Sequence, residues 1–321
     1  MRTRTLALCA LAALSLSGCG KATPTVSQGG SDLKGTVAVS GAFALYPMMT
    51  VWADEFSKVH PKVKFDIQAG GAGKGMTDAL AGAVDIGMVS REIKAEEEAK
   101  GAYWVSVAKD AVFPVINAKN PVLQHILSNG IDQATLSKIF ITGEIKTWGE
   151  AIGKPEINDA IHVYTRSDSA GSADTWAQFC GGKAQADILA GAIGVFGEPA
   201  LVDTIQKDSL GIGYSNLNSV YDPKGAAVAG ILVPPIDANG NGMADPEESN
   251  NTRAETVKAV ADGRYPSPPA RFENLVTKGK ARGVTRDFIE WILGDGQRFL
   301  GQAGYVALTS DQRAASLAKI K

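Results

Sequence analysis

The stretch TRSDSAGSADTW, residues 165–176, places one arginine before a run of small hydroxyl residues and glycine, and a helical pattern follows. Short side chains leave backbone N–H groups accessible, and the first turn of a helix carries N–H groups that have no partner inside the helix. The positive end of the helix dipole favours negative charge at the same place. The stretch therefore indicates a loop that holds a small anion. A Ser-Gly-Ser sequence is also typical of an ordinary surface loop, so this interpretation depends on similar segments elsewhere.

Two further segments have the same order of strand, small-residue loop and helix. Residues 35–41 alternate as a strand and run into SGAFALYP (40–47), where Pro47 suits the first turn of a helix. Residues 63–67 alternate as a second strand and run into GGAGKGM (70–76) before a short helix. Alternating strands and helices indicate an α/β fold with a mostly parallel sheet, and such sheets bind ligands at the carboxyl ends of their strands. The alternative is that the glycines only permit tight turns and close packing.

The N-terminal residues 1–21, MRTRTLALCALAALSLSGCGK, indicate export. Two arginines precede an apolar run that is too short to cross a bilayer as a permanent helix, as in a signal peptide. The run ends in LSGC (16–19), which resembles the bacterial lipobox, so we expect residues 1–18 to be a lipoprotein signal peptide and Cys19 to carry lipid. The alternative is an ordinary signal peptide that contains Cys19 by chance. Residues 19–34 are rich in small and polar residues and indicate a flexible tether.

Length and composition narrow the possible functions. Removal of the signal leaves 321 − 18 = 303 residues, enough for two domains of about 150 residues with separate cores. The net charge of −2 gives no reason to expect a nucleic-acid partner. Cys9 leaves with the signal and Cys19 carries lipid, so Cys180 alone remains and cannot form an internal disulfide. We expect Cys180 to be a small buried residue rather than a nucleophile.

Six segments follow one another in an order that resembles the phosphate-type substrate-binding proteins of bacterial ABC importers. They are SGAFALYP, GGAGKGMTDALAGAVDIGMVSRE, TGEIKTWGE, RSDSAGSADTW, GIGYSN and RDFIEWILGDGQRFLGQAGYVAL, spread from about residue 35 to 308. The resemblance implies a type II periplasmic-binding-protein fold, in which two α/β lobes joined by two crossing strands hold the anion between them. It places lobe one at 35–115 and 222–321 and lobe two at 116–221. The strands would cross near residues 111–116 and after residue 214.

The resemblance also implies which residues contact the anion. Arg166 would hold the anion by its charge, with Asp168 as the carboxylate that orients it, and the start of the next helix would donate hydrogen bonds. Backbone N–H groups of the first loop would bind oxyanion oxygens, and the second loop and the Ser-Arg pair at 90–91 would line the site. The implied ligand-binding residues are Ala44, Leu45, Ala72, Ser90, Arg91, Arg166, Ser169, Ala170, Gly171 and Ser172.

Several positions depart from the family's pattern. The first loop has alanine and phenylalanine where the family has hydroxyl residues, and Ala72 and Ala170 replace two serines. Lys74 adds a cation to a loop that is normally neutral. Arg91 cannot accept a hydrogen bond, whereas the aspartate at this position in other members accepts the proton of a protonated phosphate. Phosphate is therefore the first expectation, followed by arsenate, another tetrahedral oxyanion or a different anionic solute.

A separate motif, DANGNGMADPEE at 237–248, has the spacing of a calcium loop of the EF-hand kind. Oxygen ligands fall at the loop positions that such sites use, and a glycine occupies position six. The expected ligands of a structural calcium ion are Asp237, Asn239, Asn241, Met243 (backbone carbonyl), Asp245 and Glu248, in a surface insertion of lobe one. The alternative is an Asn/Gly turn, because Val-Pro-Pro at 233–235 cannot form an entering helix.

Together these features predict a lipid-anchored, extracytoplasmic solute-binding subunit of an ABC importer, in the periplasm or at the cell surface. It would act as a monomer, deliver phosphate or a similar oxyanion to permease and ATPase subunits, and touch the membrane only through its lipid anchor. No organic cofactor and no enzymatic activity are expected, since the sequence offers neither a nucleophile beside a base nor a two-metal site. The alternatives are a binding protein for another small solute, or a sensing or adhesive surface lipoprotein with structural calcium.

Overall fold

The computed structural model describes residues 33–321. The predicted signal peptide, Cys19 and all but the last two residues of the predicted tether lie outside the described residues. Within residues 33–321, none of the helices combines the length and the apolar character that a membrane crossing demands.

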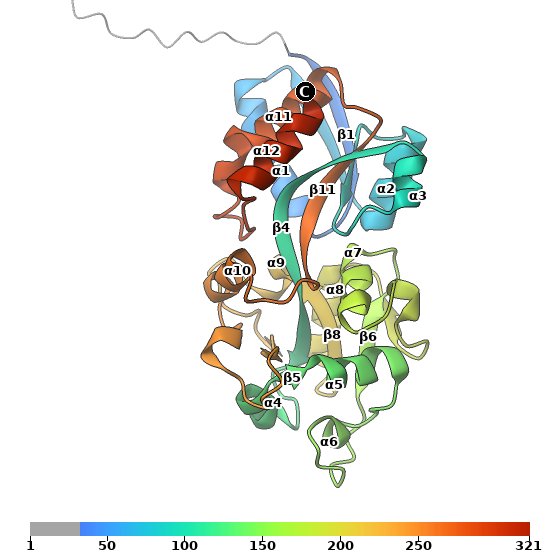
Figure 1. Ribbon diagram of the computed structural model, residues 1–321, viewed down its shortest axis with the longest axis vertical. Coiled ribbons are helices and arrows are strands. Elements are labelled where there is room, and N and C mark those ends of the chain that lie inside the picture. The colour runs from blue at the N-terminus through green and yellow to red at the C-terminus, as the bar shows by residue number, and fades with distance from the viewer. Residues whose placement is uncertain (1–32) are drawn as a thin grey trace, which may run out of the picture. The chain divides into compact units, whose positions relative to one another are not determined.

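Strands and helices alternate through most of the described chain (Figure 1). The strands are β1 (Gly35–Gly41), β2 (Val63–Ala69), β3 (Ile86–Val89), β4 (Ala102–Asn117), β5 (Ile131–Asp132), β6 (His162–Arg166), β7 (Ile193–Val195), β8 (Gly211–Asn216), β9 (Ile231–Leu232), β10 (Ile236–Asp237) and β11 (Ala270–Lys278). The α-helices are α1 (Tyr46–Val59), α2 (Ala72–Ala81), α3 (Ala95–Ala99), α4 (Leu123–Asn129), α5 (Gln133–Ser137), α6 (Trp148–Ala151), α7 (Gly171–Phe179), α8 (Glu198–Lys207), α9 (Leu217–Val220), α10 (Arg253–Asp262), α11 (Gly283–Leu293) and α12 (Ser310–Ile320).

One sheet runs through the described chain in the order β2-β1-β3-β11-β4-β8-β6-β7, with β9 paired to β4. At one end β1 pairs in parallel with β2 and β3, and at the other end β6 pairs in parallel with β7 and β8. Parallel neighbours need long crossover connections, and helices such as α1 and α7 supply them. Between the two parallel groups, β4 and β11 pair antiparallel with each other. The predicted α/β fold is confirmed, but this sheet is mixed rather than mostly parallel, because β4 and β11 pair antiparallel with all their neighbours.

Strands β4 and β11 connect two hydrophobic cores. Val105 of β4 and Leu275 of β11 belong to a first core, together with residues of α1, α2, α11 and α12. Phe113, later in β4, belongs to a second core, and Ala270 at the start of β11 packs against that core. The chain therefore enters lobe two along β4 and returns to lobe one along β11 (Figure 1). This is the two-lobed fold with two crossing strands that the sequence predicts.

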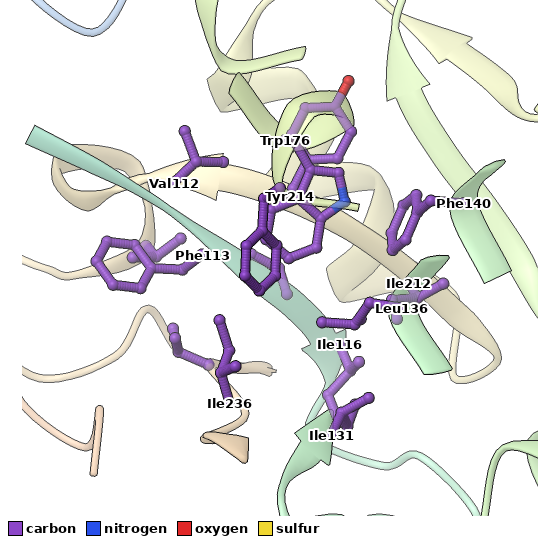
Figure 2. Close-up of a cluster of buried hydrophobic side chains, with 14 of the residues drawn as sticks. Val112, Phe113, Ile116, Ile131, Leu136, Phe140, Trp176, Ile212, Tyr214 and Ile236 are labelled. Carbon is purple, nitrogen blue, oxygen red and sulfur yellow. The ribbon is translucent and has the colours of Figure 1, made fainter. Parts of the chain in front are cut away.

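Aromatic side chains fill the centre of the second core (Figure 2). Trp176 stacks on Tyr214 with ring centroids 5.8 Å apart, and Phe140 meets Trp176 edge to face at 5.5 Å. Such pairs contribute about 0.5–1.5 kcal/mol beyond the area they bury. The hydroxyl of Tyr214 accepts a hydrogen bond of 3.2 Å from the backbone N–H of Arg166, so this core fixes the end of β6. Cys180 is fully buried in the same core, as predicted.

The two cores divide the chain differently from the expected lobe boundaries. Ile231, Ile236, Val260 and Tyr265 belong to the second core, although residues 222–321 were expected in lobe one. Strands β9 and β10 explain the difference, because they pair with β4 and β5. The loop at 237–248 therefore lies on lobe two. The second crossing is made by β11 rather than after residue 214, since β8 pairs with the later half of β4.

The crossing strands bury three charged side chains beside one another. Arg271 Nη2 lies 3.2 Å from Asp110 Oδ2, and Arg271 Nε lies 3.7 Å from Glu273 Oε1. Neither carboxylate oxygen of Glu273 accepts a hydrogen bond from a described residue. Burial raises the pKa of Glu273 well above its usual range, the charges of Asp110 and Glu198 add to this, and Arg271 opposes it only in part. The folded protein therefore favours the protonated form of Glu273 more than the unfolded chain does.

We predict that Glu273→Gln stabilises the protein more at pH 7 than at pH 4. A carboxamide has the shape of a protonated carboxyl group and needs no proton. Because the folded-state pKa of Glu273 exceeds its unfolded value, the folded wild-type chain binds more protons, and its free energy of unfolding falls as pH rises above about 4.3. The variant lacks this loss. Its free energy of unfolding should therefore exceed that of wild type by a further amount of about 1.4 kcal/mol for each unit by which folding raises the pKa of Glu273. Urea denaturation of wild type and Glu273→Gln at pH 4 and pH 7 measures the difference in their free energies of unfolding. An equal difference at both pH values would contradict the prediction.

Candidate anion-binding site

The loop at 165–176 joins a strand to a helix, as predicted. Arg166 is the last residue of β6, and Gly171 is the first residue of α7. The side chain of Arg166 is only 1% exposed. A fully buried guanidinium requires counter-charges and hydrogen-bond acceptors around it, because it cannot lose its proton.

Two carboxylates and one aromatic ring surround the Arg166 guanidinium. Its Nε donates to Asp168 Oδ1 at 2.8 Å, and its Nη2 pairs with Asp168 Oδ2. Its Nη1 pairs with Glu198 Oε1. The Phe43 ring from the first loop lies with its centroid 5.2 Å from the guanidinium carbon. The geometry agrees with the orienting role expected for Asp168.

Glu198 is a site residue that the sequence analysis missed. It is the first residue of α8 and is 3% exposed. Its Oε1 accepts a 2.6 Å hydrogen bond from Ser172 Oγ in addition to the contact with Arg166, and its Oε2 has no partner among the described residues. The carboxylate therefore occupies the donors that an oxyanion would use. An acidic residue in the first turn of a helix is usually a surface partner of the helix dipole, so the sequence carried no signal for this role.

The start of α7 provides donors in addition to the hydroxyl of Ser172. The N–H of Ala170 already donates to Gln185 Oε1 at 3.0 Å, which differs from its expected role at the anion. For the N–H groups of Gly171 and Ser172, no acceptor is present within residues 33–321. These two N–H groups are therefore the backbone donors that α7 offers to an anion.

Glycines allow the second loop and the Ser90 segment to touch the third loop. The N–H of Gly73 donates to the carbonyl of Ser169 at 3.0 Å. Gly71 has a φ of +92°, and a Cβ there would lie 2.6 Å from the same carbonyl oxygen. A Cβ on Gly171 would lie 2.3 Å from the carbonyl oxygen of Ser90. Larger side chains would force these segments apart, so the glycines set how closely the two lobes approach.

The first and second loops place their other predicted residues as follows. Ala44 and Leu45 are buried at the start of α1, and the N–H of Leu45 donates to Ala42 within its own turn at 3.2 Å. Ala72 is buried at the start of α2. The ammonium of Lys74 pairs with Asp78 on the same helix. Lys74 is thus held by α2 and does not supply a charge to Arg166 or its partners.

Arg91 pairs with carboxylates of both lobes. Its Nη1 and Nη2 donate to the two oxygens of Glu97 at 2.9 and 2.6 Å, and its Nε lies 3.2 Å from Asp174 Oδ2. Burial alone would raise the pKa of Glu97, but the hydrogen bonds and charge of Arg91 keep that pKa below its usual value. Because Asp174 belongs to α7, Arg91 forms an ion pair between the lobes. Its expected contact with the ligand stays a prediction.

The loop at 237–248 folds around the carboxylate of Asp237. Its Oδ1 accepts from the N–H of Gly240 at 2.7 Å, and its Oδ2 accepts from the N–H of Gly242 at 2.8 Å. The side chains of Asn239 and Asn241 donate to Asp245 Oδ2, and Glu248 Oε1 accepts from Ala238. Within residues 33–321, no three histidine, cysteine, aspartate or glutamate side chains gather in an arrangement that could hold a metal ion. The calcium site stays a prediction.

Comparisons with known proteins show the family and the fold of the chain. The chain is 28% identical to a phosphate-binding protein PstS of Bacillus subtilis, over 88% of this chain and 84% of that protein. Its fold matches a structure described as a phosphate ABC transporter substrate-binding protein with bound phosphate from Clostridium perfringens, with a TM-score of 0.69 and 23% identity over 86% of this chain and all of that one. It also matches an ABC-type phosphate transport receptor from Vibrio cholerae, with a TM-score of 0.63 and 19% identity over 85% of this chain and all of that one. A family model described as a PBP superfamily domain matches residues 26–296, and the chain therefore belongs to this superfamily, with the type II periplasmic-binding fold.

Proposed function

We propose that this protein is the extracytoplasmic solute-binding subunit of an ABC importer and that it captures phosphate between its two lobes. The observation that carries the proposal is the buried Arg166 at the start of α7, with loops of lobe one in direct contact with the same segment. The names of its relatives support the ligand, since they include a phosphate-binding protein and a structure with bound phosphate. Cys19 would anchor the protein, as a monomer, near its permease and ATPase partners.

Phosphate binding at Arg166 has to involve Glu198. An incoming oxyanion would compete with the Glu198 carboxylate for Arg166 Nη1 and Ser172 Oγ, which both bond Oε1. The N–H groups of Gly171 and Ser172 add two donors of fixed direction. Hydrogen phosphate carries a proton that it can donate to the unpartnered Glu198 Oε2, whereas sulfate at neutral pH carries none. Glu198 would therefore favour a protonated oxyanion, which is the role that Arg91 cannot perform.

Closure of the lobes would complete the binding cycle. Contacts between the lobes already join Gly73 to Ser169 and Arg91 to Asp174. A bound anion would add contacts to both lobes and so shift the population toward the closed arrangement. The membrane subunits would then dock on this closed form and receive the ligand.

We predict that Glu198→Gln reduces the preference for phosphate over sulfate by at least about tenfold, because a carboxamide neither repels sulfate nor accepts the phosphate proton equally well. Isothermal titration of both anions at pH 7.5 measures the two affinities.

Arg166→Ala should weaken phosphate binding by at least about 30-fold, since a buried charge-assisted contact is lost.

Lys74→Ala is the matched control, because Lys74 pairs with Asp78 on its own helix and its loss should leave both affinities within about twofold. An unchanged preference in Glu198→Gln would show that this carboxylate does not select the ligand. An unchanged phosphate affinity in Arg166→Ala would show that phosphate does not bind at this loop.

We further propose that the loop at 237–248 binds one structural calcium ion. The spacing of its oxygen-bearing residues supports this, as does the closed turn around Asp237, in which Gly240 and Gly242 both have positive φ. The loop lies on lobe two and pairs through β10 with β5. Calcium would stabilise this part of lobe two without contact to Arg166.

We predict that calcium raises the melting temperature by a few degrees with 1:1 stoichiometry and a Kd of roughly 10⁻⁵ to 10⁻³ M, because only the folded loop binds it. Glu248→Gln should abolish most of this rise by removing the bidentate ligand. Glu247→Gln makes the same charge change at the neighbouring position and should keep the rise. Differential scanning calorimetry at millimolar calcium tests both variants. If wild type does not shift, the loop is an Asn/Gly turn without an ion.

A further inference from the structure

A cavity of about 550 Å³ lies beside the crossing strands and is separate from Arg166, Ser172 and Glu198. This volume is typical of small-molecule sites. Its walls come from both lobes: Trp104, Lys109 and Phe272 from the crossing strands, Thr175 and Gln178 from α7, and Tyr265 after α10.

The pairing of β4 with β11 determines which side chains face this cavity. Lys109 and Phe272 are register partners, and the Lys109 ammonium lies 5.3 Å from the centre of the Phe272 ring. Phe272 is 38% exposed. The next register pair, Asp110 and Arg271, is buried, and its two side chains form an ion pair with each other. Lys109 and Phe272 line the cavity as one register pair, and Arg271 also lines it while its Nη2 stays paired with Asp110.

The aromatic and charged side chains that line the cavity indicate which class of ligand it would bind. Trp104, Tyr265 and Phe272 all line the cavity, but the Lys319 ammonium lies over the Trp104 ring and Tyr265 is buried, so Phe272, 38% exposed, offers the most open aromatic surface to a flat apolar group. Lys109 forms no ion pair with any residue in the described part of the chain, so its charge is available to an anionic group. Glu92 also lines the cavity, and its charge disfavours a second negative charge on the ligand. We propose that this cavity binds a small aromatic monocarboxylate, with its ring on the aromatic wall and its carboxylate on Lys109.

The position of the cavity connects it to lobe closure. Thr175 follows Asp174 in the chain, and Glu92 follows Arg91, so two of its walls adjoin the ion pair that joins the lobes. An occupant that touches both walls favours the arrangement in which the lobes are in contact. By linkage, such a ligand and phosphate raise each other's affinity. This coupling rests on the proposed phosphate function, whereas the binding itself does not.

Isothermal titration of the purified protein with phenylacetate tests the site, with neutral phenylacetamide and cationic phenethylamine as matched probes. We expect phenylacetate to bind with a Kd of about 1 mM or tighter, and both other probes to bind at least about tenfold more weakly. Lys109→Gln should weaken phenylacetate binding at least about fivefold. Lys64→Gln makes the same charge change on exposed β2 and should have no effect. Gln178→Trp, which fills the cavity from α7, should abolish binding.

Three results would overturn the proposal: no binding of phenylacetate at about 10 mM, equal binding of phenylacetamide, or unchanged binding in both Lys109→Gln and Gln178→Trp. Melting curves confirm that each variant is folded. Saturating phenylacetate should tighten phosphate binding at least about twofold. An unchanged phosphate Kd would refute the coupling alone, and an absence of phosphate binding with intact phenylacetate binding would refute only the proposed importer function.

Discussion

The buried positive charge of Arg166 is the constraint on which the rest of the site depends. A guanidinium that is removed from water must be matched by acceptors of opposite charge, and here Asp168 and Glu198 supply them. Both carboxylates are held by other elements: Asp168 accepts from the N–H of Gly197, and Glu198 accepts from Ser172. One charge thereby ties the end of β6 to the starts of α7 and α8. The same cluster is suited to exchange one of its carboxylates for an oxyanion.

The closeness of the lobes follows from small residues and from one ion pair. Gly71, Gly73 and Gly171 let backbone meet backbone across the lobes, because a Cβ at any of them would collide with Ser90 or Ser169. Arg91, held in place by Glu97, reaches Asp174 on the other lobe. A neutral hydrogen bond such as that from Gly73 to Ser169 contributes only about 0.5–1.5 kcal/mol, so these contacts hold the lobes together while leaving room for a ligand to shift the balance.

The parts of this structure that local pattern determines could be predicted from the sequence, and the parts set by distant partners could not. The loops before α1, α2 and α7 follow from strand alternation, glycine and helix-start signals, and Arg166 stands out as the only charge before a run of small residues. Glu198 could not be found, because nothing in the sequence of α8 shows that its first residue meets Arg166 across a gap of 32 positions. The sequence around Arg91 does not show whether its side chain faces an anion or the carboxylates of Glu97 and Asp174. The assignment of residues 231–265 to lobe two depends on the short strands β9 and β10, whose partners lie about a hundred residues earlier.

The most direct test of the account is a crystal structure of the protein grown with phosphate at neutral pH. We predict one phosphate with oxygens within hydrogen-bond distance of Arg166 Nη1, Ser172 Oγ and the N–H of Gly171. Glu198 should then have left Arg166 and should accept the phosphate proton. A structure in which phosphate lies elsewhere, while Glu198 keeps its contacts with both Arg166 and Ser172, would contradict the account.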